Sequence, residues 1–317
     1  SSVILEIFSR HARTAQAKTQ VEIARLEYLL PRLTGAWTHF QRQTGGGLRS
    51  RGMGEKQIEV DRRRARERIS RLQAKLGQIQ KEMKTQRRAR SREWKVALVG
   101  YTNTGKTTLM RNLTMSKVAG RDELFATLDT NIKVIDPRTR PKVLLSDTVG
   151  FIRNLPDSLV ESFRSTLQEA VEADLLLHVI DLSHHNYKQQ IETTKTVLAE
   201  LGASEVPIFL VFNKVDKVED DVLLKIIRAA YPKSFLISAN SSADVLKLRQ
   251  RILDFFLKYM VRCELRVPVD DSEGLSKVYA QCLVNDADYS QAGWVIFQVE
   301  VGQVSLTKVK KYINLDC

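Results

Sequence analysis

Apolar residues recur at helical spacing through the first third of the chain. Residues 3–30 carry apolar side chains three or four positions apart, which predicts a helix that Pro31 bends or ends. A second series recurs at steps of four and three, as in a heptad seam: Ala65, Ile69, Leu72, Leu76, Ile79 and Met83. It predicts a second helix from about Glu55 to Arg90. Two such helices joined by a connector predict an α-helical, antiparallel coiled-coil hairpin, an arm that covers residues 1–94.

The connector between these helices is rich in glycine and arginine. Five glycines and two arginines lie between Thr44 and Gly54, which predicts a flexible, cationic tip loop over about residues 43–55. Trp37 and Phe40 precede the loop. These aromatic rings could stack on unpaired bases or simply cap the coil, and the sequence leaves both readings open.

The middle of the chain alternates short apolar runs with amphipathic stretches. The runs predict these strands: Trp94–Val99, Val143–Ser146, Leu175–Ile180, Ile208–Phe212 and Phe235–Ile237. Covering helices are predicted over Glu219–Ala230 and Asp244–Tyr259. This alternation is typical of a doubly wound, parallel-rich sheet that binds its ligand at the carboxyl ends of the strands. We assign this α/β domain to residues 95–260.

The last 57 residues predict a small α+β module, residues 261–317. Strands are expected at Leu265–Val269, Leu283–Asp286 and Trp294–Val301, with a helix around Ser276–Cys282. The module carries no catalytic constellation, so docking is its expected role.

A phosphate-binding loop follows the first strand of the α/β domain. Gly100–Thr107 has the pattern G-x-x-x-x-G-K-[ST] between a strand and a helix, the context that defines a P-loop. Lys106 is expected to reach the outer phosphates, and the Thr107 hydroxyl to ligate Mg²⁺. The residues expected to contact the nucleotide here are Tyr101, Thr102, Asn103, Thr104, Gly105, Lys106, Thr107 and Thr108.

Two further segments supply candidate switch residues. Asp147 ends a strand and can hold Mg²⁺ through water, while the Gly150 amide can meet the γ-phosphate. Between them and the P-loop, Thr127 is the candidate that senses Mg²⁺ and the γ-phosphate, and Thr130 is the fallback. The expected catalytic residues are therefore Lys106, Thr127 and Gly150, and the expected metal ligands are Thr107, Thr127 and Asp147.

The base is specified by two later motifs. Asn213, Lys214 and Asp216 form N-K-x-D, in which the Asp216 carboxylate accepts hydrogen bonds from guanine N1–H and the 2-amino group. Ser238, Ala239 and Asn240 follow another strand, and the Ala239 amide is expected to donate to guanine O6. Together with the P-loop these motifs predict a GTPase that binds GTP, GDP and Mg²⁺.

One position departs from the usual arrangement of the hydrolysis site. Many GTPases place a glutamine after the glycine of D-T-x-G to orient the attacking water, whereas this chain has Phe151. A phenylalanine side chain neither donates nor accepts a hydrogen bond. We therefore expect slow hydrolysis unless a partner orders the water.

The net charge of +13 is concentrated ahead of the P-loop. Residues 1–95 hold 23 Lys and Arg against 9 Asp and Glu, which favours a polyanionic partner, nucleic acid before membrane. The candidate RNA-binding residues are Arg42, Arg49, Arg51, Lys56, Arg62 and Arg63. The three scattered cysteines predict neither a disulfide framework nor a zinc site, and no apolar run is long enough to span a membrane.

These motifs resemble the HflX-type GTPases. The resemblance rests on the P-loop, on Phe125–Asp129, on Asp147–Gly150 with the following Phe151-Ile152-Arg153, and on Asn213–Asp216 with Ser238-Ala239. In the arm it rests on Tyr28–Gly35, Trp37-Thr38-His39, Gly45-Gly46-Gly47 and Arg51–Gln57.

The resemblance implies a monomeric factor that binds the large ribosomal subunit through rRNA and ribosomal proteins. Its arm tip would reach the peptidyl-transferase region, and GTP binding and hydrolysis would split and recycle ribosomes. The alternative is an assembly placeholder on late large-subunit precursors. Lys56, Asp129–Lys133 and Thr107 depart from the usual family residues, which favours a member from the mitochondrial matrix over the bacterial cytoplasm.

Overall fold

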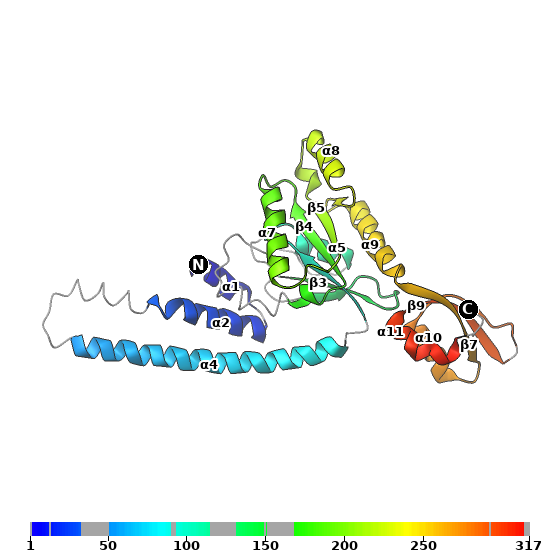
Figure 1. The fold of residues 1–317 in the computed structure, drawn as a ribbon, viewed down its shortest axis with the longest axis horizontal. Coiled ribbons are helices and arrows are strands. Elements are labelled where there is room, and N and C mark those ends of the chain that lie inside the picture. The colour runs from blue at the N-terminus through cyan, green and yellow to red at the C-terminus, as the bar shows by residue number, and fades with distance from the viewer. Residues whose placement is uncertain are drawn as a thin grey trace.

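The computed structural model describes residues 2–12, 14–32, 51–89, 93–114, 131–148, 150, 168–291 and 293–313. A helical arm, an α/β domain and a small C-terminal module follow one another along the chain (Figure 1). Among the described residues, none of the helices combines the length and the apolar character needed to cross a bilayer. This order matches the predicted fold class, an α/β domain between a helical region and a small α+β module.

The first part of the arm is two helices where the apolar pattern predicted one. α1 covers Ser2–His11 and α2 covers Ala15–Leu29. The break follows from local capping: the Thr14 hydroxyl accepts a hydrogen bond from the Ala17 amide at 3.1 Å and begins a new helix. The prediction of a single helix over residues 3–30 was wrong because the spacing of apolar residues does not indicate where an N-cap begins a new helix.

α4 covers Arg51–Ala89, a length of about 58 Å at 1.5 Å per residue. It runs in the opposite direction to α2 and extends beyond it (Figure 1). The helix begins four residues before the predicted Glu55, so the tip loop cannot extend to residue 55. Gly52 and Gly54 are accommodated as helical residues, at a cost of about 1 kcal/mol each relative to alanine. The rest of the predicted tip lies outside the described residues.

The apolar seam of α4 faces α2 where the two helices overlap. Leu72 is buried, and the other predicted seam residues are half-buried. α2 and α1 share a second small core that includes Phe8, Ala17 and Val21. Arg68 joins the two long helices through its Nε and Nη2 atoms, 2.9 and 2.8 Å from Glu22 Oε1. Among the described residues of the arm, the narrow seam, the small core of α1 and α2 and the Arg68–Glu22 ion pair therefore hold the helices together.

The α/β domain contains a six-stranded sheet in the order β2-β3-β1-β4-β5-β6. Its strands are β1 (Trp94–Val99), β2 (Asn131–Val134), β3 (Val143–Asp147), β4 (Leu175–Asp181), β5 (Ile208–Asn213) and β6 (Phe235–Leu236). All neighbours are parallel except β2 and β3, which are antiparallel. β2 was not predicted, because its four residues alternate polar and apolar over too short a run to register as a strand.

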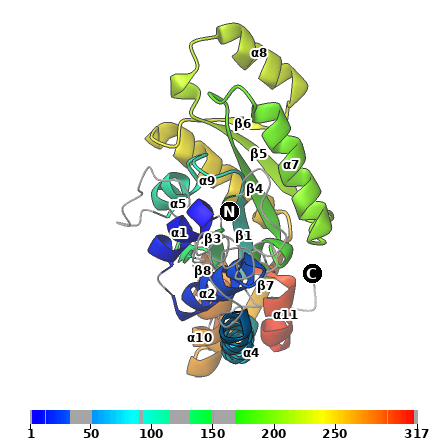
Figure 2. The same ribbon diagram turned by 90° about the vertical axis from the view of Figure 1, so that its left-hand side faces the viewer.

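Helices cover both faces of this sheet. α5 (Lys106–Leu113) and α9 (Ser242–Leu257) pack on one face through Leu109, Leu248 and Ile252. α7 (Tyr187–Glu200) and α8 (Asp221–Ala230) pack on the other face. Figure 2 shows α5 and α9 on one side of the strands and α7 on the other. The carboxyl ends of the parallel strands are thereby left open for a ligand.

The C-terminal module is a three-stranded antiparallel sheet in the order β7-β9-β8. β7 (Met260–Pro268), β8 (Leu283–Asp288) and β9 (Trp294–Gly302) are covered by α10 (Ser272–Gln281), α11 (Gln303–Val309) and the short η2 (Lys310–Tyr312). β7 begins directly after α9, and β1 begins shortly after α4 ends at Ala89. We propose the domain boundaries at these two connections.

Candidate nucleotide-binding site

The P-loop turns tightly between β1 and α5, and two glycines make the turn possible. Gly100 and Gly105 have φ angles of 141° and 94°, which side chains other than glycine rarely adopt. A Cβ on Gly100 would lie 2.2 Å from the Val179 carbonyl oxygen, and one on Gly105 would lie 2.3 Å from Asn213 Nδ2. The loop backbone therefore lies so close to Val179 and Asn213 that a residue with a Cβ atom does not fit at Gly100 or Gly105.

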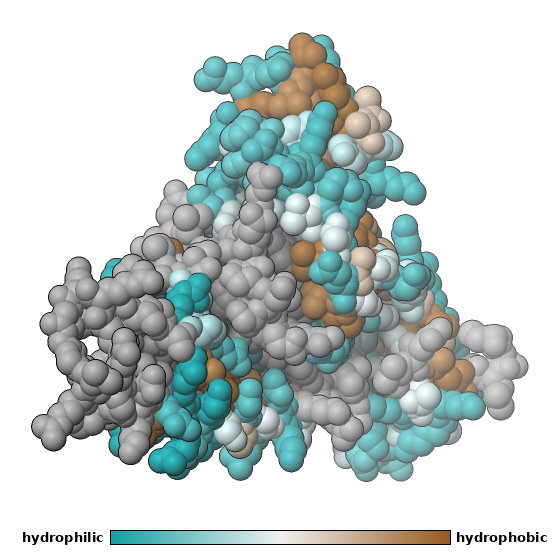
Figure 3. Space-filling model, turned by 60° about the vertical axis from the view of Figure 1, so that its left-hand side comes forward, coloured by the Kyte–Doolittle hydropathy of each residue, from teal (hydrophilic) through white to brown (hydrophobic). Residues whose placement is uncertain are grey.

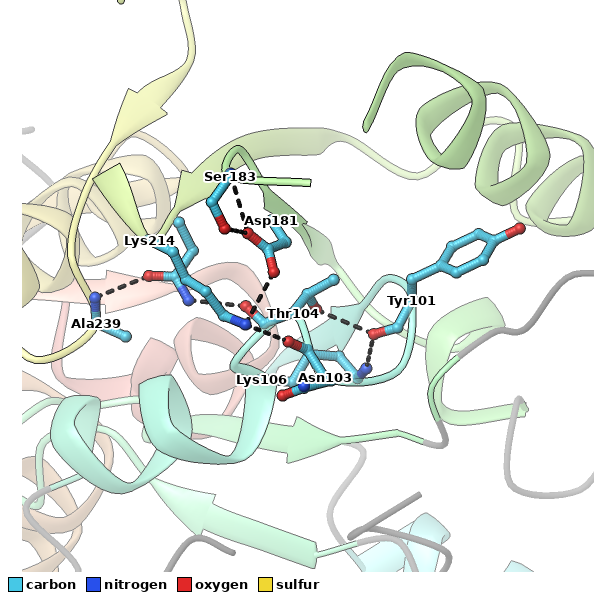
Figure 4. Close-up of polar contacts among 9 residues, drawn as sticks. Tyr101, Asn103, Thr104, Lys106, Asp181, Ser183, Lys214 and Ala239 are labelled. Carbon is cyan, nitrogen blue, oxygen red and sulfur yellow. Dashed lines mark hydrogen bonds and ion pairs between the residues drawn. The ribbon is translucent and has the colours of Figure 1, made fainter. Parts of the chain in front are cut away.

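Lys106 lies buried beneath the loop. Its Nζ donates to the carbonyl oxygen of Gly100 at 3.1 Å. It also donates to the carbonyl oxygen of Tyr101 at 2.7 Å (Figure 4). Burial lowers the pKa of Lys106 from 10.5 to about 8, and the negative charge of Asp147 offsets part of this shift. The ammonium group is thus held at the loop by carbonyl dipoles that phosphate oxygens can replace.

Nucleotide binding should take up protons at Lys106. Phosphate oxygens favour the charged lysine and raise its pKa, so at pH 8, where about half of this group is neutral, binding should take up about half a proton. Affinity should accordingly fall as the pH rises above 8. Calorimetry of GDP binding in buffers of different ionisation enthalpy measures the uptake.

The control is Lys106→Arg, whose guanidinium stays protonated throughout this range. Proton uptake that persists in this variant would assign the effect to another group.

Thr107 and Asp147 form the candidate magnesium pair. Thr107 Oγ1 donates to Asp147 Oδ2 at 2.8 Å, and the register of β1 and β3 places Asp147 beside Leu98, next to the start of the loop. A hydroxyl and a carboxylate are hard oxygen ligands of the kind that Mg²⁺ takes, so the donor set fits this ion. The two residues were predicted from separate motifs, and the structure brings them together.

Gly150 lies against the P-loop. A Cβ placed on it would be 2.8 Å from Thr102 Cα and 2.9 Å from Lys106 Nζ. Gly150 therefore lies beside Thr102 and Lys106 of the P-loop, and its contact with the γ-phosphate stays a prediction. Thr127, Thr130 and Phe151 lie outside the described residues, so their predicted roles stay predictions.

Asn213 joins the phosphate loop to the base-recognition motifs. Its Nδ2 donates to the Thr104 carbonyl at 2.7 Å, and its Oδ1 accepts from the Ala239 amide at 2.8 Å. Asn112 Nδ2 donates to the Ala239 carbonyl at 2.6 Å. The Ala239 amide, predicted to donate to guanine O6, is therefore engaged by Asn213 in this structure.

The remaining base-recognition residues surround this connection. Asp216 is exposed on the short helix η1 (Val215–Lys217), where its carboxylate can meet a ligand. The Ser238 hydroxyl accepts from the Asn240 amide at 3.4 Å, while the Ser238 amide donates to Asp244 Oδ2 at 3.0 Å.

Asp181 is a residue of this site that sequence reasoning missed. Lys214 has a left-handed φ of 64°, and its Nζ lies 2.8 Å from Asp181 Oδ2 and 2.7 Å from the Asn103 carbonyl oxygen. Asp181 Oδ1 accepts from the Ser183 amide at 3.0 Å and from its hydroxyl at 2.6 Å (Figure 4). Asp181 ends β4 in register with Asn213 at the end of β5, a relation that requires the strand order and not only the sequence.

Asp181→Asn should weaken GTP and GDP binding alike, by about tenfold, because Lys214 loses the charged partner that fixes its stem beside the base. The hydrolysis rate of bound GTP should stay unchanged, since Lys214 does not approach the γ-phosphate side of the loop. Equilibrium titration with both nucleotides and single-turnover hydrolysis separate these effects.

Ser183→Ala is the matched comparison for Asp181→Asn. It removes a hydrogen bond from the same carboxylate but leaves the Lys214 contact, so its effect should be smaller. Equal losses in the two variants would assign the effect to the β4 turn and not to Lys214.

The predicted RNA-binding residues belong to the arm, apart from the nucleotide site. Arg42 and Arg49 lie outside the described residues, and Arg51 and Lys56 lie in α4 with side chains that are not described. Arg62 and Arg63 follow on the same helix, and Arg63 Nε lies 3.9 Å from Glu67 Oε1 in an exposed pair.

The site combines a P-loop that contains a buried lysine, the Thr107–Asp147 pair and the N-K-x-D motif. These features define a guanine-nucleotide-binding P-loop domain. Family comparisons agree with this class. Residues 95–214 match the family described as 50S ribosome-binding GTPase, and residues 11–90 match the GTP-binding GTPase Middle Region.

Individual relatives extend over nearly the whole chain. GTPase HflX of Gluconacetobacter diazotrophicus is 43% identical over 313 residues, which cover 98% of this chain and 68% of that protein. GTPase HflX of Escherichia coli is 39% identical over 315 residues, 98% of this chain and 74% of that protein. This chain belongs to the HflX family of GTPases.

The chain covers only part of these relatives. It spans 51% of GTPase HflX of Flavobacterium psychrophilum, to which it is 50% identical over 214 residues. A solved structure, a GTP-binding protein from Sulfolobus solfataricus in complex with GDP, is similar at a TM-score of 0.50 and 28% identity, covering 81% of this chain and 71% of that chain.

Proposed function

We propose that this protein is a GTPase that binds the large ribosomal subunit and splits and recycles ribosomes in a GTP-dependent cycle. The observation that carries the proposal is the short connection between a strongly basic helix and the phosphate loop. α4 ends at Ala89, β1 begins at Trp94, and the loop begins at Gly100. The proposed RNA-binding helix is therefore followed almost directly by the first strand of the nucleotide site.

The nucleotide chemistry follows from the residues around the loop. Lys106 replaces its carbonyl contacts with phosphate oxygens, and the Gly150 amide together with Thr127 is proposed to contact the γ-phosphate. Thr107, Asp147 and Thr127 would hold Mg²⁺, which when bound neutralises charge on the β- and γ-phosphates. Asp216 selects guanine, while Lys214 supports the base.

Hydrolysis is proposed to depend on a partner. Phe151 occupies the position after Gly150 where a glutamine would orient the attacking water, and its side chain has no polar atom. A group on the ribosome, or a backbone group that the ribosome positions, would order this water. Single-turnover hydrolysis should therefore be slow with the protein alone and faster with large subunits.

The partner assignment follows from the charge of the arm. We propose that the arm tip reaches rRNA near the peptidyl-transferase region, with Arg42, Arg49, Arg51, Lys56, Arg62 and Arg63 as RNA contacts. The net charge of residues 1–95 and the match of residues 95–214 to a ribosome-binding GTPase family support this assignment.

Assembly of the large subunit is the second candidate function. The same basic arm could hold rRNA in an immature subunit, as a placeholder on late precursors. Sedimentation separates the two: intact ribosomes mixed with the protein and a non-hydrolysable GTP analogue should yield free subunits. Intact ribosomes under every condition would contradict splitting, and enrichment on late precursors would support assembly.

The mitochondrial matrix is the compartment that we propose, with the protein acting as a monomer. The very basic arm and the departures at Lys56, Thr107 and Asp129–Lys133 support it. The relatives named above are bacterial proteins, which supports the bacterial cytoplasm as the alternative. Fractionation of cells that express the natural gene, with detection in purified mitochondria, tests the assignment.

A further inference from the structure

The shaft of the arm contains a groove between α2 and α4, separate from the tip. It has a volume of about 400 Å³, and its lining includes the exposed Ala15 and the buried Thr19 and Leu72. Thr19 and Leu72 are 3% and 5% exposed. Because the two α2 side chains are small, the helices leave a concave surface at this level instead of closing over the seam.

Long cationic side chains form the rim of the groove. Lys18 lies on α2, and Arg71 and Lys75 lie on α4, one helical turn apart. All three are exposed, and none of them makes an ion pair or side-chain hydrogen bond with another residue of the described part of the chain. Ala15 is also the first residue of α2, so the positive end of that helix opens on the groove.

A single acid at this level is already neutralised. Glu22 Oε1 lies 2.8 and 2.9 Å from the Arg68 guanidinium, so this pair fixes the two helices and adds no net charge. The uncompensated charge of the groove therefore comes from three cations on two different helices. A solvated face of an ordinary helix pair would intersperse acids among them.

The occupant that fits this arrangement is an RNA phosphate backbone. A run of phosphates can pass along the groove and meet cations on both sides, and α4 continues the positive surface with 13 Lys and Arg against 5 Asp and Glu. An amphipathic protein helix or a membrane would need exposed apolar area. Among the described arm side chains, Leu29 is the only large apolar one that is exposed.

Figure 3 shows one face of the molecule coloured by hydropathy. A hydrophobic patch lies at the top, over α8, among hydrophilic side chains. Val222 and Ile226 of α8 are 62% and 52% exposed. These two exposed apolar residues belong to the α/β domain and not to the arm.

We infer that the groove rimmed by Lys18, Arg71 and Lys75 binds the phosphate backbone of structured RNA, as a contact on the shaft that is independent of the arm tip. This inference deepens the proposed function and rests on it for the identity of the RNA. It predicts that the arm is held on RNA at two separated levels, the tip and the middle of the shaft.

The test compares two charge-matched triple variants of the full chain. The groove variant is Lys18→Gln, Arg71→Gln, Lys75→Gln, and the control is Arg64→Gln, Arg66→Gln, Lys81→Gln, three exposed cations of α4 that do not line the groove. Glutamine keeps helix propensity close to that of the residues replaced, and circular dichroism verifies that both variants keep their helix content.

Binding to a fluorescent RNA duplex is measured by anisotropy between 50 and 200 mM salt, with polyglutamate and anionic phosphatidylglycerol vesicles as alternative ligands. Compared with the control, the groove variant should show a plot of log affinity against log salt concentration whose slope is shallower by about 2. Its affinity for the RNA duplex should be about tenfold lower than that of the control. Equal losses in the two variants would overturn the inference. So would a loss for polyglutamate or vesicles as large as the loss for RNA.

Co-sedimentation with large ribosomal subunits separates this inference from the proposed function. Failure of the wild-type protein to co-sediment would contradict the proposed function. The duplex experiment would still show whether the groove binds RNA. In the opposite case the wild-type protein co-sediments, but the groove variant and the control have the same salt dependence of binding. This result would contradict RNA binding by the groove and would not contradict the proposed function.

Discussion

Asp216→Asn should move the nucleotide preference of this protein from guanine to xanthine. The carboxylate of Asp216 is exposed at the base end of the site, where it can accept from both N1–H and the 2-amino group of guanine. An asparagine amide replaces one acceptor by a donor, so an N–H of the asparagine would face the N–H donor of the guanine 2-amino group. The same asparagine N–H can donate to the C2 carbonyl oxygen of xanthine.

The expected size of this effect is large, because a site built around paired hydrogen bonds rejects a mismatched ligand by up to about 10⁴-fold. We expect GTP affinity to fall by about 10³-fold and XTP affinity to rise. Titration with fluorescent analogues of both nucleotides measures the change.

Asp220→Asn is the matched control, four residues along the chain. Asp220 is the N-cap of α8 and accepts from the Val222 amide at 2.8 Å. Asparagine caps helices as well as aspartate does, so this charge removal should leave both affinities unchanged. A GTP affinity of Asp216→Asn within threefold of the wild-type value would contradict the assignment of the base.

Gly150→Ala should strongly slow ribosome-stimulated hydrolysis while sparing GDP binding. The added Cβ would lie 2.8 Å from Thr102 Cα and 2.9 Å from Lys106 Nζ, so the segment that carries Gly150 must move away from the loop. The γ-phosphate then loses its amide contact. The loss of one preorganised donor typically reduces a rate by 10²- to 10³-fold, and we expect a decrease of about 100-fold or more.

Single-turnover GTP hydrolysis with large subunits and equilibrium binding of GDP provide the two readouts. Gly77→Ala is the control: Gly77 lies in α4, and a Cβ there meets nothing within 4 Å. This control should raise the free energy of unfolding of the arm by up to about 1 kcal/mol and leave hydrolysis unchanged. Normal hydrolysis by Gly150→Ala would show that Gly150 has no role at the γ-phosphate.

The nucleotide site could be predicted in large part from the sequence, because its motifs report local backbone requirements. The β1 bounds, Trp94–Val99, agree with the apolar run, and the P-loop follows it directly. Two separate motifs named Thr107 and Asp147 as ligands of the same ion, and the structure places these side chains 2.8 Å apart. Their role at Mg²⁺ stays a prediction.

Features that depend on tertiary neighbours or capping could not be predicted in this way. The Asp181 contact with Lys214 depends on β4 and β5 ending side by side. The Ala239 amide was assigned to guanine without its protein partner Asn213, which lies 26 positions earlier in the chain. The start of α4 at Arg51 required two glycines to be helical, against their usual preference.

The length of α4 gives the arm a mechanical advantage. A rod of about 58 Å that pivots at its β1 end moves its far end by about 1 Å for each degree of rotation. Sub-ångström rearrangements of the strand that leads into the P-loop would therefore be enlarged several-fold at the opposite end. In the reverse direction, the arm acts as a long lever. A modest force on its far end would therefore exert a large torque on β1, the strand that leads into the P-loop.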